Sequence, residues 1–235
     1  YTDVKGIYTT DPRIEPKAKK IKLITFEEML EMASLGAQVM QARSIEVAKR
    51  YNIPIHVRSS FSKEEGTMIV KKNEKMEEIA VRGVTCKKAE AKITICAVPD
   101  QTGIAAKIFT DISKMAVNVD MIVQNVSHTK LTDISFTVSK SDLPKAIQSA
   151  RAVAQKIRAG EVLFDKGIAR ISVVGSGMRS HHGIAAKMFQ VLAENKINID
   201  MISTSEISIS CIISQRHAEK AVRALHQKFG LEALV

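Results

Sequence analysis

Hydrophobic residues in the last two thirds of the chain recur at two spacings, every second residue in some runs and every third or fourth in others. The first spacing is typical of half-buried strands and the second of amphipathic helices. From these runs we predict strands at residues 91–98, 117–126, 131–138 and 161–164, and helices at residues 103–115 and 142–157. This β-α-β-β-α-β order is the ferredoxin-like plan, so we predict a first module of that fold over residues 89–166.

The pattern then repeats. Residues 103–109, GIAAKIF, return as residues 183–189, GIAAKMF, and ten of the twenty positions from 103 to 122 are identical at an offset of 80. Strands are predicted at residues 168–175, 197–203 and 207–213, and helices at residues 183–194 and 217–229. Such self-similarity indicates two copies of one supersecondary unit. The second module, over residues 167–235, is one strand short.

A spare strand precedes the first module. Residues 78–86 contain Ile79, Val81 and Val84 and belong to neither copy. Because an unpaired sheet edge is costly, we predict that residues 76–88 complete the sheet of the second module. The first module would then be inserted into the second, and neither would fold well alone.

Residues 1–75, the amino-terminal segment, mix turns, helices and short strands in an α/β pattern. Thr25 is a predicted helix N-cap, and Glu28 three residues later completes a capping box. We predict helices from Phe26 and over residues 42–51, a strand at residues 53–57, and a domain boundary in the charged connector at residues 71–78. The chain opens on Tyr1 rather than Met, so we expect a fragment or a trimmed chain.

Composition narrows the function classes. The 235 residues are 45% apolar and 26% charged, which is typical of a soluble globular protein. The net charge of +10 is spread along the chain and aromatic residues make up only 4%, which argues against nucleic-acid binding. No apolar stretch approaches the eighteen residues of a membrane span. Cys86, Cys96 and Cys211 are widely spaced in apolar runs, so we expect reduced thiols, no bound metal and a cytoplasmic location.

The loop between the first strand and first helix of the first module combines a carboxylate with a helix start. Backbone N–H groups at that start suit an anionic group, and Asp100 suits an ammonium. Asn118 and Asp120 open the next strand and Gln124 follows on it, so together these residues could hold an amino-acid zwitterion. The alternative is that Asp100 only caps the helix and Asn118 only forms a turn. The second copy at the same register leaves both interpretations open.

The second module differs in the corresponding loop, residues 175–183, which is two residues longer and lacks the acid. Gly175 and Gly177 resemble a dinucleotide-binding fingerprint only weakly, because the third glycine is out of place. His181 and His182 diverge as neighbours and are expected to be loop residues rather than metal ligands. No catalytic constellation is evident, so both modules are predicted to bind rather than catalyse.

The motifs resemble one family. The run YTDVKGIYTTDPR at residues 1–13, FEEMLEMA at residues 26–33 and PIHVRSSF at residues 54–61 resemble the aspartate kinases of the amino-acid kinase fold. Residues 78–230 resemble that family's paired regulatory ACT domains. The resemblance implies domains at residues 1–75 (kinase), 89–166 (first ACT domain) and 167–235 (second ACT domain), with residues 76–88 completing the last.

The resemblance implies an ATP site along the amino-terminal segment. Its implied residues are Thr2, Asp3, Tyr8, Thr9, Thr10, Asp11, Pro12, Arg13 and Gln38. Tyr8 would pack on the adenine and Arg13 would meet phosphate oxygens. Gln38 stands where the family commonly has a lysine, which puts one phosphate contact in doubt. The parent enzyme would use ATP with magnesium to convert L-aspartate to 4-phospho-L-aspartate, the first step toward lysine, threonine and methionine.

The family's aspartate-binding residues and its phosphate-binding lysine would precede Tyr1. The resemblance therefore implies no catalytic residues in this chain, which alone is not expected to phosphorylate aspartate.

The resemblance also implies feedback inhibition by threonine, lysine or both, bound between ACT domains of a homo-oligomer. In the first module the implied effector residues are Asp100, Gln101, Thr102, Gly103, Ile104, Ala105, Asn118, Val119, Asp120 and Gln124. In the second they are Ile184, Ala185, Asn198, Ile199, Ser205 and Glu206. Thr102 stands where the family usually has proline. The alternative is a stand-alone effector-binding subunit, but such subunits begin near residue 76, and the leading kinase segment argues against it.

Overall fold

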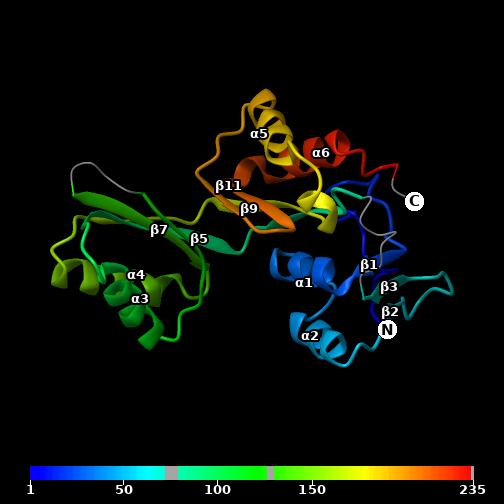
Figure 1. Ribbon diagram of the computed structural model, residues 1–235, viewed down its shortest axis with the longest axis horizontal. Helices are drawn as coiled ribbons and strands as arrows, with labels where there is room; N and C mark the ends of the chain where they lie inside the picture. Colours follow the sequence, from blue (N-terminus) through cyan, green and yellow to red (C-terminus); the bar gives the residue numbers. More distant parts are fainter. Residues whose placement is uncertain (72–78, 126–129, 234–235) are drawn as a thin grey trace. The chain divides into compact units, whose positions relative to one another are not determined.

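The computed structural model describes residues 1–71, 79–125 and 130–233 (Figure 1). The chain folds into two compact units. One unit is Tyr1–Lys87 together with Ala169–Val235, and the other is Lys88–Ile168. The chain therefore leaves the first unit and returns to it, which confirms the predicted insertion of the first module into the second.

The inserted unit is a four-stranded sheet with two helices on one face (Figure 1). Its elements are β5 (Glu90–Pro99), α3 (Ile104–Lys114), β6 (Val119–Gln124), β7 (Leu131–Ser139), α4 (Leu143–Lys156) and β8 (Val162–Asp165). The strand order is β6-β7-β5-β8, so the predicted ferredoxin-like plan is confirmed. Alternate residues of β5, Ile93 and Ile95, pack against Ile108 of α3 in the core of this unit.

The second module lies in the other unit. Its elements are β4 (Gly83–Lys87), β9 (Ile168–Val174), η2 (Ser176–Arg179), α5 (Ile184–Glu194), β10 (Met201–Thr204), β11 (Ser208–Ser214), η3 (Gln215–His217) and α6 (Ala218–Lys228). The strand order is β10-β11-β9-β4, and β4 pairs antiparallel with β9. The predicted completion of this sheet by a strand from before the first module is thus confirmed.

The added strand is shorter than expected. It begins at Gly83, so Ile79 and Val81 precede it, while residues 76–78 of the predicted segment lie outside the described residues, as does nearly all of the predicted boundary. Gly83 lies against the amino-terminal segment, because a Cβ there would be 2.8 Å from the Thr9 carbonyl oxygen. Val84 N donates to the same oxygen at 2.7 Å. The start of β4 therefore needs glycine.

The amino-terminal segment forms a small three-stranded sheet with two helices. Its elements are β1 (Leu23–Thr25), α1 (Phe26–Ser34), α2 (Ala42–Arg50), β2 (Ile55–Val57) and β3 (Thr67–Val70), with strand order β1-β3-β2. The predicted capping box is confirmed, because the Thr25 and Glu28 side chains each bond the other's backbone N–H. Strands β1 and β3 were not predicted, because their three and four residues are too short to show a period.

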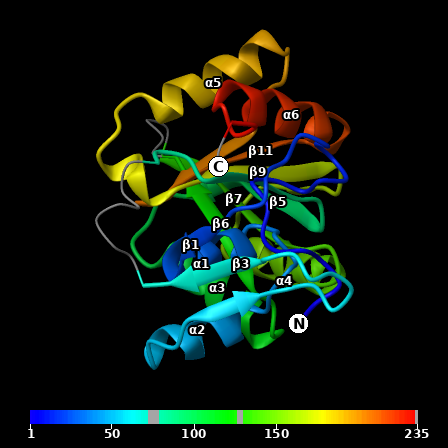
Figure 2. The same ribbon diagram turned by 90° about the vertical axis from the view of Figure 1, so that its right-hand side faces the viewer.

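In the unit formed by Tyr1–Lys87 and Ala169–Val235, α5 and α6 cover one face of the second module's sheet, and the amino-terminal segment lies on the other face (Figure 2). Val174 at the end of β9 belongs to the core of the amino-terminal segment. The second module and the segment therefore share packing.

Shortening Val84 tests the role of β4. Its side chain is fully buried in the second module's core, opposite Val173 of β9. Val84→Ala should lower the free energy of unfolding by about 1–3 kcal/mol and increase amide exchange along β9 and β11. Val47→Ala on α2, where the side chain is 51% exposed, should change stability by less than about 0.5 kcal/mol. Unchanged protection of β9 would show that β4 is dispensable.

Candidate functional site

The residues expected to line an ATP site form an irregular extended segment. Thr2 N donates to the Arg58 carbonyl oxygen at 2.9 Å, and Tyr8 forms an isolated antiparallel bridge with Lys20. Asp3, Pro12 and Arg13 are exposed, Tyr8 and Asp11 are half-buried, and Gln38 is exposed in the turn between α1 and α2.

Thr9 has a structural role that the sequence did not reveal. Its side chain is fully buried, its Oγ1 accepts a hydrogen bond from Lys19 N at 2.9 Å, and it bonds His226 Nε2 at 2.8 Å. His226 lies on α6 of the second module. Burial lowers the pKa of His226, against the opposing charges of Glu15 and Glu232. The Thr9 hydroxyl therefore makes its hydrogen bonds within the protein and not with solvent. The Thr10 side chain is also buried.

Arg13 is paired with an acid from its own turn. Its guanidinium donates to both Asp11 carboxylate oxygens, at 3.0 Å from Nε to Oδ1 and at 2.8 Å from Nη2 to Oδ2. This hydrogen bonding raises the pKa of Arg13, and the side chain is 87% exposed. Asp11 thus holds one edge of the guanidinium in place. The remaining N–H groups of Arg13 stay accessible to a ligand from solvent.

The predicted effector loop of the first module has an open helix start. Asp100, Gln101, Thr102 and Gly103 are exposed, and Gly103 adopts a left-handed conformation with φ +84°. Among the described residues, the Asp100 side chain forms no hydrogen bond, so the interpretation of Asp100 as a mere helix cap is wrong. Ile104 N donates to the Gln101 carbonyl oxygen at 3.1 Å, so the Asp100 carboxylate and the N–H groups of Ala105 and Ala106 are the groups left available at this helix start.

The structure does not bring the remaining candidates of the first module to that loop. Val119 pairs with Val138 of β7, whereas Pro99 pairs with Leu131, seven residues earlier on the same strand. At about 3.4 Å per residue, this separates Asn118–Asp120 from the Asp100 loop by about 24 Å along the sheet. Gln124, opposite Ile134, lies nearer to the loop. The expectation of one zwitterion site formed by all these residues within a module is therefore wrong, because α3 carries the chain to the opposite end of the sheet.

The second module repeats this division between its two ends. Ile184 and Ala185 begin α5 next to the loop at residues 175–183, and Gly175 N bonds the Ile207 carbonyl oxygen beside Ser205 and Glu206. Asn198 and Ile199 precede β10 at the other end.

Helix α1 occupies the loop end of the second module. Ser205 Oγ and Ser208 Oγ donate to Glu31 Oε1 at 3.2 and 2.5 Å. One turn earlier, Glu28 Oε1 accepts hydrogen bonds from Ser176 N and Ser176 Oγ, both at 2.9 Å. Glu206 is paired with Arg179. Glu28 thus binds the loop whose counterpart in the first module is open, and Glu31 binds the neighbouring turn between β10 and β11.

The sequence did not indicate the roles of Glu31, Ser176, Ser208 and His226. Their partners are more than 140 residues away, so no local spacing could have indicated them. Only the Glu28 position was indicated, as part of the capping box.

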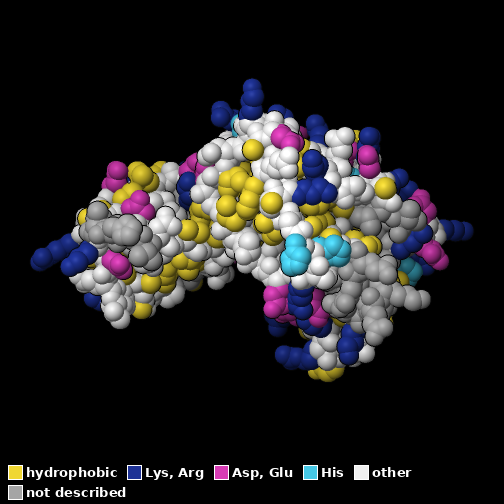
Figure 3. Space-filling model, turned by 45° about the horizontal axis from the view of Figure 1, so that its top comes forward, with side chains coloured by type: hydrophobic (Ala, Val, Ile, Leu, Met, Phe, Trp, Pro, Cys, Tyr) yellow, Lys and Arg dark blue, Asp and Glu magenta, His cyan; other side chains and the backbone are white. Residues whose placement is uncertain are grey.

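Other chemistry is limited. All three cysteines are free thiols, and burial raises the pKa of Cys211 to about 12 and also raises that of Cys96. The described ranges contain no group of three His, Cys, Asp or Glu side chains placed to hold a metal ion. Among the described helices, none has the length and apolar content needed to cross a membrane. On the face shown in Figure 3, Lys and Arg side chains are scattered rather than gathered into one patch.

Two family models match the chain. The family described as "ACT domain" matches residues 90–153 and 171–229, which are the two modules. The family described as "Amino acid kinase family" matches residues 1–59.

Aspartate kinases match nearly the whole of this chain in sequence and in structure. An aspartate kinase of Pseudomonas putida is 50% identical over 99% of this chain. The chain spans 57% of that protein's length. The crystal structure of Clostridium acetobutylicum aspartate kinase is 26% identical, with a TM-score of 0.88 over 97% of this chain and 53% of that one. Escherichia coli aspartokinase III, solved with aspartate and ADP, is 27% identical, with a TM-score of 0.81 over 97% of this chain and 51% of that one. The same enzyme with lysine and aspartate has a TM-score of 0.76 over the same shares.

These matches fit the observed order of an amino-terminal α/β segment followed by two ferredoxin-like modules, one inserted in the other. The chain belongs to the aspartate kinase family and carries part of the amino acid kinase domain together with two ACT domains.

Proposed function

We propose that this chain is part of an allosteric enzyme that transfers the γ-phosphoryl group of ATP to L-aspartate and is inhibited by threonine, lysine or both. The main support for this function is that an amino acid kinase segment and two ACT modules occur together in a chain 50% identical to an aspartate kinase. The E. coli relative was solved in complex with aspartate and ADP, and in complex with lysine and aspartate. Magnesium would accompany the nucleotide and neutralise its phosphate charge. The kinase match at residues 1–59 weighs against a stand-alone regulatory subunit.

ATP would lie along the exposed side of residues 2–13. Half-buried Tyr8 would pack on the adenine, and exposed Arg13, oriented by Asp11, would donate its remaining N–H groups to phosphate oxygens. Thr10 would contribute backbone groups only, because its side chain is buried. Thr9 would lie beneath this surface, since its side chain, N–H group and carbonyl oxygen are all bonded within the protein. Thr2, Asp3, Pro12 and Gln38 would border this surface.

An effector amino acid would need two modules. The open helix start of α3 suits its carboxylate, Asp100 suits its ammonium, and Gln124 lies toward the same end. Asn118–Asp120, and Asn198 with Ile199 in the second module, lie at the opposite ends of their sheets. We therefore infer that the loop end of one module and the strand-start end of another enclose each ligand, which a homo-oligomer assembled through ACT domains would supply.

The second module would transmit the signal. Its α6 bonds Thr9 through His226, and its loop end bonds α1 through Glu28 and Glu31. A ligand that changes the position of the second module would therefore also move residues 2–13 and α1 of the amino-terminal segment. An effector acts by its differential affinity for the two arrangements, typically about 1–3 kcal/mol.

Calorimetric titration tests effector binding. We expect threonine or lysine to bind the chain, and Asp100→Ala to weaken binding about tenfold or more, because a hydrogen bond to a charged group contributes about 1.5–3 kcal/mol. Glu161→Ala is the control, since Glu161 is an exposed acid of the same module. Absence of binding heat with both amino acids would contradict the proposed regulation.

The pH dependence of stability tests the Thr9–His226 contact. The folded-state pKa of His226 lies below its ordinary value of about 6.5, so the unfolded chain takes up the proton first as pH falls. Stability should therefore be intact above pH about 6.5 and decrease below it. His226→Gln should flatten this decrease in thermal melts from pH 8 to 5.5, whereas His182→Gln, at an exposed position, should not. Parallel curves for wild type and His226→Gln would refute the contact.

A further inference from the structure

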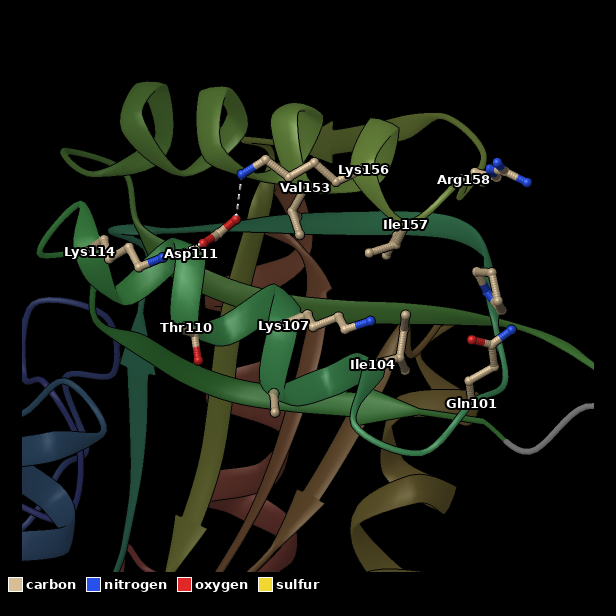
Figure 4. A pocket seen from close by; sticks show the side chains of 12 residues that line it. Gln101, Ile104, Lys107, Thr110, Asp111, Lys114, Val153, Lys156, Ile157 and Arg158 are labelled. Atoms are coloured by element: carbon tan, nitrogen blue, oxygen red, sulfur yellow. Dashed lines mark hydrogen bonds and ion pairs between the residues drawn. The ribbon is translucent and has the colours of Figure 1, made fainter.

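A pocket of about 730 Å³ lies in the first module and shares only Gln101 and Ile104 with the implied effector residues. It lies between α3 and the end of α4, on the helix side of the sheet (Figure 4). Its volume falls within the range of roughly 300–1,000 Å³ typical of small-molecule sites.

The floor of the pocket is apolar. Ile104 and Val153 are 6% and 1% exposed, and half-buried Ile157 faces the cavity from the end of α4. Figure 4 shows Ile104 and Ile157 on opposite helices with open space between them. Such a floor suits an apolar ligand body.

The charges of the lining are divided between two ends. At one end, Asp111 bonds Lys114 at 2.8 Å and Lys156 at 2.9 Å, and these hydrogen bonds lower the pKa of Asp111 to about 2. At the other end lie Lys107 and Arg158, whose side chains form no hydrogen bond or ion pair with any described residue. Gln101 borders this end, and in Figure 4 the Lys107 amine lies beside Ile104 while the Arg158 guanidinium extends outward.

The second module has different residues at the matched positions. Lys187 occupies the position of Lys107 in the repeat, and its Nζ lies 5.0 Å from the centre of the Phe229 ring. Phe229 is the C-cap of α6, as Ile157 is the C-cap of α4. The following residues, Gly230 and Arg158, both have positive φ angles, of 66° and 56°. At matched positions the first module therefore has a smaller apolar residue and an additional cation.

We propose that this pocket binds a small organic anion, with its phosphate or carboxylate at Lys107, Arg158 and Gln101 and its apolar body on Ile104, Val153 and Ile157. The excess of cations disfavours the ammonium of a free amino acid, so this ligand is distinct from the proposed threonine or lysine effector. The proposal does not rest on the proposed function.

Fluorescence anisotropy with 1-naphthyl phosphate as the probe tests this inference. The probe should bind the chain, 1-naphthoate should bind as well, and neutral 1-naphthol should bind at least tenfold more weakly. The variant Ile157→Phe/Arg158→Gly gives the first module the residues of the second and should weaken 1-naphthyl phosphate at least tenfold. Glycine fits the positive φ at residue 158, so this variant should stay folded.

Two controls separate this site from others. Lys107→Ala should also weaken the probe about tenfold, whereas Lys187→Ala, which removes the counterpart that lies on Phe229, should change its affinity less than twofold. Saturating threonine and lysine should not displace the probe. Equal binding of 1-naphthol, an equal effect of Lys187→Ala, or displacement by either amino acid would each overturn the proposal.

Discussion

One buried carboxylate holds the amino-terminal segment and the second ACT domain together. Glu28 is fully buried, and its two oxygens accept hydrogen bonds from Thr25 N, Thr25 Oγ1, Ser176 N and Ser176 Oγ. The Arg82 guanidinium lies 3.6 Å away. A buried charge costs several kcal/mol unless donors and a counter-charge compensate it, so the helix start and the loop must stay in register. The cap of α1 is therefore also the docking site of the second module.

This junction constrains the rest of the chain. Arg82 directly precedes Gly83 and Val84, which contact the Thr9 carbonyl group as β4 begins. The strand then completes the second module's sheet before the chain leaves for the first module. Thr9 meets the same module again at His226. The amino-terminal segment and the second ACT domain thus form one unit, while the first module is connected to it as an insertion.

Much of this organisation was predictable because it depends on local periods. The repeat at an offset of 80 indicated both modules, the Thr25–Glu28 spacing indicated the cap, and the missing strand indicated the insertion. Contacts of long sequence separation were not predictable. The Thr25–Glu28 spacing predicts the hydrogen bonds of one Glu28 carboxylate oxygen. The other oxygen accepts from Ser176, which is 148 residues away in the sequence. The predicted zwitterion site failed for a related reason: Asn118 follows Asp100 closely in sequence, but a helix carries it to the other end of the sheet.

The most direct test of the account is a double-mutant cycle between Glu28 and Ser176, measured by urea unfolding of the chain. If the carboxylate joins α1 to the second module, Glu28→Ala and Ser176→Ala should show a coupling energy of about 1 kcal/mol or more. Effects that add to within about 0.5 kcal/mol would show that the two residues act independently and would contradict the account.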